Sequence, residues 1–78
     1  MADYRLWGRI EQIGPHEFLA IVSAIPADGR GSPHARVETR LETSLDAARD
    51  ALRSVLVGVG LALGAEGARV TDTETDGL

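Results

Sequence analysis

The chain has 78 residues and is 44% hydrophobic, so we expect one small folded domain and not a disordered chain. Its net charge of −4 argues against a nucleic-acid-binding surface, which is normally basic. The absence of cysteine excludes disulfides and thiolate metal sites, which leaves oligomerisation as the common device that widens the thin stability margin of so small a domain.

Two strands are predicted in the first third of the chain. Alternating apolar and polar residues predict the first over residues 4–13, and a turn at residues 14–16 ends it. The second strand, residues 16–25, is apolar on both faces, which is typical of a central strand covered on both sides. Because a short chain has little material for a second covering layer, we expect a partner subunit to cover one face. The apolar residues are Phe18, Ala20, Val22 and Ala24 on one face and Leu19, Ile21 and Ile25 on the other.

The clearest strand pattern lies in residues 34–43, after a loop rich in proline and glycine at residues 26–33. One face of this strand is uncharged and the other alternates in charge. The uncharged face carries Ala35, Val37, Thr39 and Leu41, and the charged face carries Arg36, Glu38, Arg40 and Glu42. Arg5, Arg9 and Glu11 of the first strand are candidates for the same face as the charged row, where Arg–Glu pairs between strands would stabilise the sheet.

A helix is predicted next, because residues 43–46 fit the Ser/Thr-x-x-Asp/Glu capping pattern with Thr43 as the N-cap. Apolar residues then recur with helical spacing as far as Leu63. The glycines late in this segment each disfavour a helix by about 1 kcal/mol relative to alanine. The helix therefore either continues to about Gly64 as part of a buried subunit contact or ends near Gly58, and continuation is the favoured alternative.

The last residues predict only a short element and a tail. Residues 68–73 are compatible with a final strand, and residues 71–78 form an acidic segment that we expect to fray. The folded core of the single domain is thus expected over residues 4–70. The predicted fold class is α+β: a three-stranded antiparallel sheet packed by one helix, in the order β-β-β-α, with or without a short fourth strand.

No pattern in the sequence predicts an active site, a metal site or a cofactor site. His16 and His34 each lie beside a turn, without a second histidine or an i, i+4 carboxylate, so exposed turn histidines are the favoured interpretation. The Gly-Val-Gly run late in the helix departs from the dinucleotide-binding pattern because its third glycine comes one position late. The alternating acids of the tail lack the glycine and the closing glutamate of a calcium loop. We expect a protein that is not an enzyme.

The residues expected at a subunit interface come from the sheet and from the helix. Trp7 lies among the polar residues of the first strand, where a large aromatic side chain is either a contact residue or a partly buried anchor of the monomer. Gly60 and Gly64 have the spacing of small residues that permits close packing, either within the domain, which is favoured, or between two helices. The predicted interface residues are Trp7, Leu19, Ile21, Ile25, Leu56, Gly60 and Gly64.

Composition and hydropathy indicate a bacterial, cytoplasmic protein. All eight cationic residues are arginine, and together with the many alanines and glycines this indicates a GC-rich genome. The N-terminal residues lack the basic and apolar regions of a signal peptide. The longest apolar stretch, residues 55–65, is shorter than the about 20 residues that span a membrane.

The order of these elements resembles the HicB-like antitoxin domain, and the resemblance covers residues 4–70. The matching positions are Tyr4, Gly14, Phe18-Leu19-Ala20-Ile21-Val22 and Ile25-Pro26 in the strands, Thr43, Asp46, Ala47 and Ala51 in the helix, and Gly67 before the final strand. The resemblance implies a partial ribonuclease-H-like scaffold without its catalytic acids, which forms dimers or tetramers and covers a small basic ribonuclease toxin. Many members carry a helix-turn-helix or ribbon-helix-helix module that this chain lacks, so operator binding by this chain is not expected.

Three functional hypotheses remain open on the sequence. The first is a homo-oligomeric, non-enzymatic protein–protein interaction module whose acidic surface steers a basic partner. The second is a small nucleic-acid-binding domain, which interleaved glutamates oppose. It would use a sheet face formed by Arg5, Arg9, Arg36, Arg40 and Trp7. The third is a ligand-binding domain with a cleft between subunits.

Overall fold

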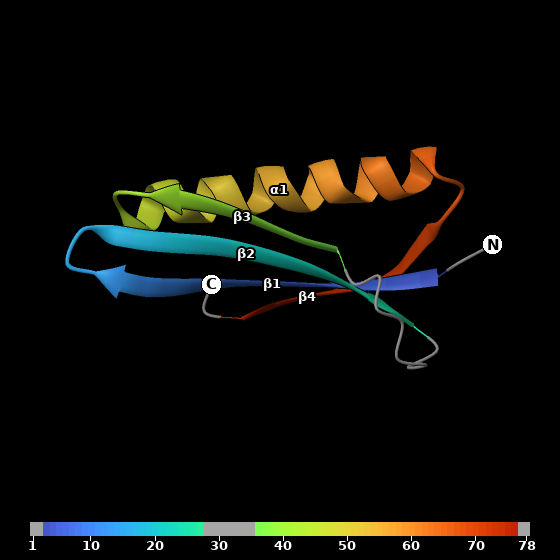
Figure 1. Ribbon diagram of the computed structural model, residues 1–78, viewed down its shortest axis with the longest axis horizontal. Helices are drawn as coiled ribbons and strands as arrows, with labels where there is room; N and C mark the ends of the chain where they lie inside the picture. Colours follow the sequence, from blue (N-terminus) through green and yellow to red (C-terminus); the bar gives the residue numbers. More distant parts are fainter. Residues whose placement is uncertain (1–2, 28–35, 77–78) are drawn as a thin grey trace.

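The computed structural model describes residues 3–27 and 36–76, which form two layers: one helix lies across one face of a four-stranded sheet (Figure 1). This confirms the α+β class and the single helix packed on the sheet. The elements in chain order are β1 (Asp3–Gly14), β2 (Glu17–Pro26), β3 (Arg36–Glu42), α1 (Leu45–Ala65) and β4 (Arg69–Asp76).

The sheet is mixed, with the strand order β3-β2-β1-β4, and is not a purely antiparallel sheet of three strands. β1 and β2 pair antiparallel, as do β2 and β3, whereas β4 pairs parallel with β1. The 21-residue helix is about 30 Å long, and it returns the chain to the end of the molecule where β1 begins (Figure 1). β4 therefore starts beside the first residues of β1 and runs in the same direction.

The core lies between α1 and the face of the sheet that it covers, called here the helix face. Leu52 is fully buried and lies over Gly8 of β1, where an added Cβ would be 3.2 Å from Leu52 Cδ1. The absence of a side chain at Gly8 thus permits the helix to approach the sheet closely. The buried core cluster comprises Leu6, Ala20, Val22, Ala24, Ala51, Leu52, Val59 and Leu63.

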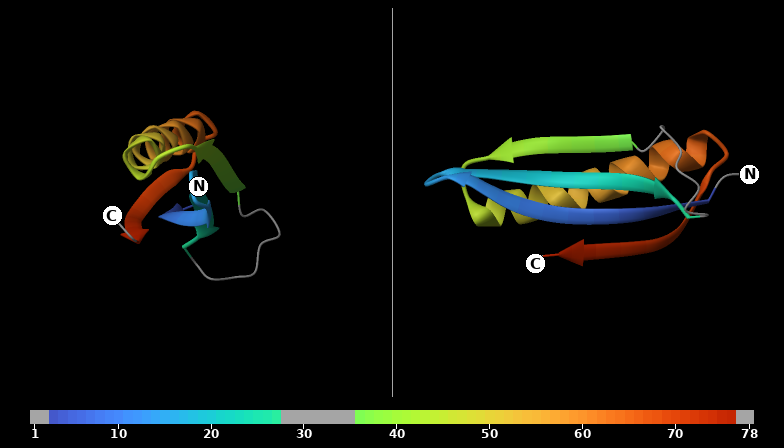
Figure 2. Two further views of the ribbon diagram at one scale, coloured as in Figure 1. Left: turned by 90° about the vertical axis from the view of Figure 1, so that its left-hand side faces the viewer. Right: turned by 60° about the horizontal axis from the view of Figure 1, so that its bottom comes forward.

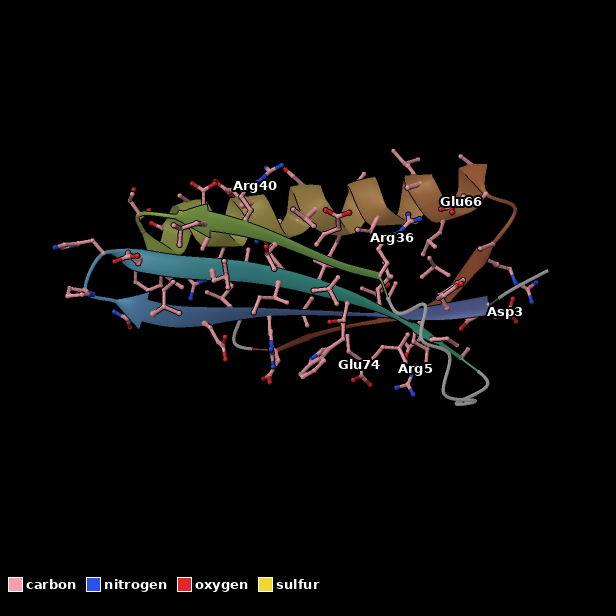
Figure 3. All side chains as sticks on the ribbon, in the orientation of Figure 1. Asp3, Arg5, Arg36, Arg40, Glu66 and Glu74 are labelled. Carbon is pink, nitrogen blue, oxygen red and sulfur yellow. The ribbon has the colours of Figure 1, made fainter. Side chains whose placement is uncertain are left out.

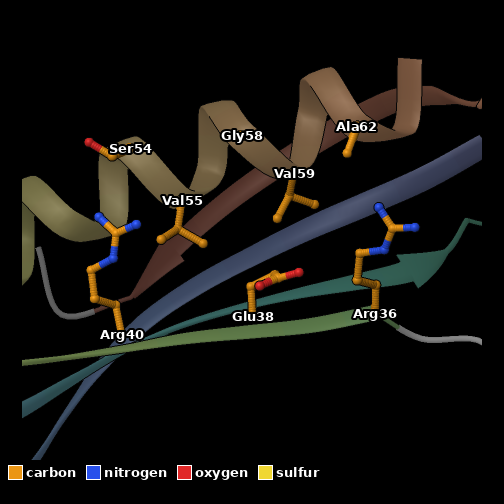
Figure 4. Close-up of a pocket in the computed structure, with 8 residues that line it drawn as sticks. All are labelled: Arg36, Glu38, Arg40, Ser54, Val55, Gly58, Val59 and Ala62. Carbon is orange, nitrogen blue, oxygen red and sulfur yellow. The ribbon is translucent and has the colours of Figure 1, made fainter. Parts of the chain in front are cut away.

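The charged rows of β1 and β3, which were expected to share a face, lie on opposite faces of the sheet. The register of β3 with β2 places Arg36, Glu38 and Arg40 on the helix face, beside α1 (Figure 4). Arg5 and Arg9 of β1 lie on the opposite face, and β2 lies between β1 and β3, so the expected Arg–Glu pairs between these strands are wrong. The helix face accommodates this charged row because β3 is an edge strand beside an open groove, from which long charged side chains reach water.

The N-cap of α1 differs from the prediction, whereas the extent of the helix agrees with it. The N-cap is Ser44, not Thr43, because Ser44 has extended backbone angles and its Oγ accepts a hydrogen bond of 3.1 Å from Ala47 N. The prediction that the helix continues past Gly58 is confirmed, since it runs to Ala65. It ends in a Schellman motif, in which Ala68 N donates to Leu63 O, and Gly67 has the positive φ of 81° that this turn requires.

The final strand is longer than expected. β4 extends from Arg69 to Asp76, so the prediction of a fraying tail from residue 71 is wrong as far as Asp76. The parallel ladder with β1 occupies backbone groups that a tail would leave to water. Ion pairs between Arg69 and Asp3, at 3.2 Å, and between Arg5 and the acids of β4 also join the two strands.

Candidate protein-interaction surface

The face of the sheet opposite α1, called here the open face, divides into an apolar half on β2 and β3 and a charged half on β1 and β4. The cross-strand registers, read together with the alternation of each strand, assign the residues to this face. The apolar half, named here the apolar strip, comprises Leu19, Ile21, Ile25, Val37 and Leu41. The charged half comprises Arg5, Arg9, Glu11, Asp72, Glu74 and Asp76, with Trp7 beside the apolar strip.

Much of the apolar strip is exposed. Val37 is 58% exposed, Leu41 55% and Ile25 42%, and no described helix or strand lies over this face (Figure 2). Ile21 is only 6% exposed, because Arg9 of β1 and Thr39 of β3 are its direct cross-strand neighbours. The apolar strip is therefore exposed along β3 and buried at Ile21 in its centre.

Interactions within the chain partly neutralise the charged half of the open face. The Arg9 guanidinium lies 5.0 Å from the centroid of the Trp7 ring, at cation–π distance. Arg5 lies 3.9 Å from Asp72 and 3.7 Å from Glu74 (Figure 3). Arg5 and Arg9 thus both have partners on the face itself, and three acids of β4 line its margin.

The proposed arginine platform for nucleic acid is not assembled. Arg36 and Arg40 lie on the helix face, while Arg5, Arg9 and Trp7 lie on the open face. A groove that follows a phosphate backbone needs a continuous cationic track, and the sheet separates these four arginines into two pairs. This arrangement disfavours the nucleic-acid hypothesis.

The predicted interface residues fall on two layers and do not form one surface. Trp7, Leu19, Ile21 and Ile25 come together on the open face. The helical members lie on the other side of the sheet, where Leu56 is half-buried against the core. The remaining two members are Gly60 and Gly64, and a Cβ added at either would meet nothing within 4 Å. The close packing of these glycines within the domain, the favoured alternative, is therefore wrong.

The sequence interpretation also missed two exposed members of the apolar strip, Val37 and Leu41. The signal was present in the alternation of β3, which separates these residues from the charged row. What alternation cannot tell is which of the two faces meets the helix. Without that assignment, Val37 and Leu41 could not be joined with Leu19 and Ile25 into one surface.

Two hollows lined by described residues were compared with ordinary small-molecule sites, and neither resembles one. A groove of about 260 Å³ lies between β3 and α1, with Arg36, Glu38 and Arg40 facing the helix (Figure 4). A second hollow of about 170 Å³ lies beside Trp7 and Ile25 on the open face. Ligand pockets usually enclose about 300–1,000 Å³, so the hollows give no support to a ligand-binding function.

Metal binding finds no support in the described part of the chain. No group of three or more histidine, aspartate or glutamate side chains there is arranged to hold a metal ion. His16 is exposed in the turn between β1 and β2, as predicted, while His34 lies outside the described residues. Within residues 3–27 and 36–76, no helix combines the length and the apolar character that crossing a membrane requires.

Comparison with known proteins gave no match: no family model, no curated protein and no solved structure matches this chain.

Proposed function

We propose that this chain is a non-enzymatic protein–protein interaction module, that it assembles with copies of itself, and that its open face binds a second protein. The observation that carries the proposal is the exposed apolar strip, in which Ile25, Val37 and Leu41 lie on one face without a covering layer among the described residues. Exposed apolar surface of this kind commonly marks a protein contact. The small hollows and the divided arginines favour this function over ligand or nucleic-acid binding.

The charges around the apolar strip suggest the chemistry of the second protein. Asp72, Glu74 and Asp76 line the β4 margin of the open face, and the whole chain has a net charge of −4. A complementary protein would place apolar side chains over β2 and β3 and basic side chains over β4, and the opposite charges would accelerate its association. A small basic ribonuclease toxin, the partner that the HicB-like resemblance implies, would supply the basic side chains.

Site-specific photo-cross-linking tests the proposal. A photo-reactive residue at Ile25, which is 42% exposed on the open face, should give an adduct with a small basic protein in the cells of origin. The matched control position is Leu61, which is 71% exposed on the helix and lies outside the proposed surface. Mass spectrometry identifies the adduct.

The identified protein is then mixed with the chain in purified form. We expect Ile25→Arg to weaken its binding by about tenfold or more, because the substitution places a charge in the apolar contact, while Leu61→Arg leaves the binding unchanged. If the protein is a ribonuclease, the chain should inhibit it. Equal adduct yields at positions 25 and 61, or equal effects of the two substitutions, would contradict binding through the open face.

A further inference from the structure

The outer edge of β3 is complementary to itself. β3 is the terminal strand of the sheet, and no described strand pairs with its outer side (Figure 2). Its seven residues, Arg36–Glu42, alternate in charge on the helix face and carry Val37, Thr39 and Leu41 on the open face. We propose that two copies of the chain pair their β3 strands antiparallel about a two-fold axis at Thr39, which joins the two sheets into one. This interface deepens the homo-oligomeric part of the proposed function and rests on it.

In this register every residue of β3 faces a suitable partner. Arg36 lies opposite Glu42 of the partner subunit, and Glu38 lies opposite Arg40 of the partner subunit; the symmetry repeats both pairs. Val37 lies opposite the partner's Leu41, and Thr39 lies opposite the partner's Thr39. Opposite charges, apolar pairs and Thr–Thr pairs are the cross-strand combinations that stabilise antiparallel sheets. A two-fold interface requires this kind of self-complementarity.

The neighbouring registers are disfavoured by the same charges. A two-fold axis at Glu38 would place Arg36 opposite Arg40 of the partner subunit and Glu38 opposite its own copy. An axis at Arg40 would place Glu38 opposite Glu42 of the partner subunit and Arg40 opposite its own copy. Registers between these would put opposed side chains on different faces of the pleated sheet. Axes at Val37 or Leu41 would again oppose unlike charges, but each would pair only three residues. The charge order and the number of paired residues together therefore select the axis at Thr39, about which all seven residues pair.

Three of the four charged side chains of β3 are free to make these pairs, while Arg36, which pairs with Glu66 at 2.7 Å, would share its guanidinium between Glu66 and Glu42 of the partner subunit. Glu38 and Arg40 are exposed, and the ion pairs among the described residues leave Glu38, Arg40 and Glu42 without a partner. A two-fold axis perpendicular to the sheet keeps both helices on the same side. It also joins the two apolar strips across the seam, because Val37 and Leu41, each more than half exposed, meet their counterparts there. The apolar strip and the edge of β3 thus form one continuous surface.

A charge-swap experiment tests this interface. In E38R, two arginines would face two arginines across the axis, and in R40E two glutamates would face two glutamates. Each single variant should raise the self-dissociation constant by about tenfold or more, because two attractive pairs become two repulsive pairs. In an equimolar mixture of the two variants, every repulsive pair is replaced by an attractive one. The mixture should therefore form a heterodimer, and E38R/R40E should dimerise like the original chain.

Sedimentation velocity, from micromolar to millimolar chain, measures the association, and circular dichroism of each variant checks its fold. R53E and D50R are the matched controls, since they make the same charge changes on the exposed side of α1 and should dimerise normally. A dimer that E38R and R40E leave intact would overturn the β3 interface and leave self-assembly standing. A chain that stays monomeric throughout the range would overturn both. Single variants that do not recombine into a heterodimer would overturn the register.

Discussion

The two edge strands of the sheet, β3 and β4, differ in how their charges are arranged. β3 alternates arginine and glutamate, so antiparallel pairing with a second copy can bring unlike charges together. β4 begins with Arg69, which pairs with Asp3, and then carries only acids on its open-face row, at Asp72, Glu74 and Asp76. Self-pairing of β4 about Thr73 would place Asp72 opposite Glu74 of the partner subunit. Pairing about Glu74 would place Asp72 opposite Asp76 of the partner subunit and Glu74 opposite its own copy. A row of charges of one sign opposes pairing of the edge with a second copy. A row of alternating charges permits such pairing only in registers that oppose unlike charges.

The two edges also differ in how they are held to the rest of the domain. β4 is joined to β1 by a parallel ladder and by ion pairs from Arg5 and Arg69. β3 is joined to β2 by an antiparallel ladder and to the end of α1 by an ion pair of 2.7 Å between Arg36 and Glu66. Both edges depend on the same core, in which Leu52 is the largest fully buried side chain. Substitutions in the core and at each edge can therefore measure separately how the core and the edge contacts contribute to stability.

The largest loss of stability is expected when the core that supports both edges loses a side chain. Leu52→Ala leaves a cavity under the centre of α1 and should lower the free energy of unfolding by about 2–5 kcal/mol. Chemical denaturation followed by circular dichroism measures it. Leu61→Ala removes the same number of atoms from a side chain that is 71% exposed, and should change the stability by no more than about 0.5 kcal/mol. Equal losses in the two variants would mean that α1 does not pack on the sheet through Leu52.

Smaller changes in stability, of opposite sign, are expected when a glycine near each edge is replaced by alanine. Gly67 precedes β4 and has a φ of 81°, so Gly67→Ala should destabilise the fold by about 1–2 kcal/mol. Gly58 faces the groove beside β3 in a regular helix, and a Cβ there meets nothing within 4 Å. Gly58→Ala should therefore stabilise the fold by up to about 1 kcal/mol. Thermal and chemical denaturation measure the change in stability of each variant. If both variants were stabilised, or both destabilised, the prediction would be wrong.

The smallest effects are expected at the ion pairs of the two edges. Arg36→Ala, on the β3 side, should cost about 1 kcal/mol or less, because the pair with Glu66 is short but partly exposed. Arg5→Ala, on the β4 side, should cost less still, since its two contacts are 3.7 and 3.9 Å long and the side chain is 53% exposed. A double-mutant cycle of Arg36 with Glu66, at low and high salt, isolates the pair. A larger loss for Arg5→Ala would reverse the ranking.

Periodicity within each segment predicted the location of most elements, because alternation and helical spacing are local properties of the chain. Strands β1 to β3 and the passage of α1 through Gly58 were predictable for this reason. Three of the five members of the apolar strip were also predictable, since Leu19, Ile21 and Ile25 share a second apolar face of β2. The choice between Thr43 and Ser44 as N-cap was not, because both side chains suit that position and the backbone angles decide between them.

The sequence by itself thus determined which residues of a strand share a face and in what order the charges of β3 alternate. Only the tertiary structure decided that this charged row lies beside the helix, that Val37 and Leu41 join the open face, and that β4 pairs parallel with β1. The physical reason is that alternation defines two faces without naming the buried one. That assignment comes from long-range strand pairing and from how far one helix covers a four-stranded sheet.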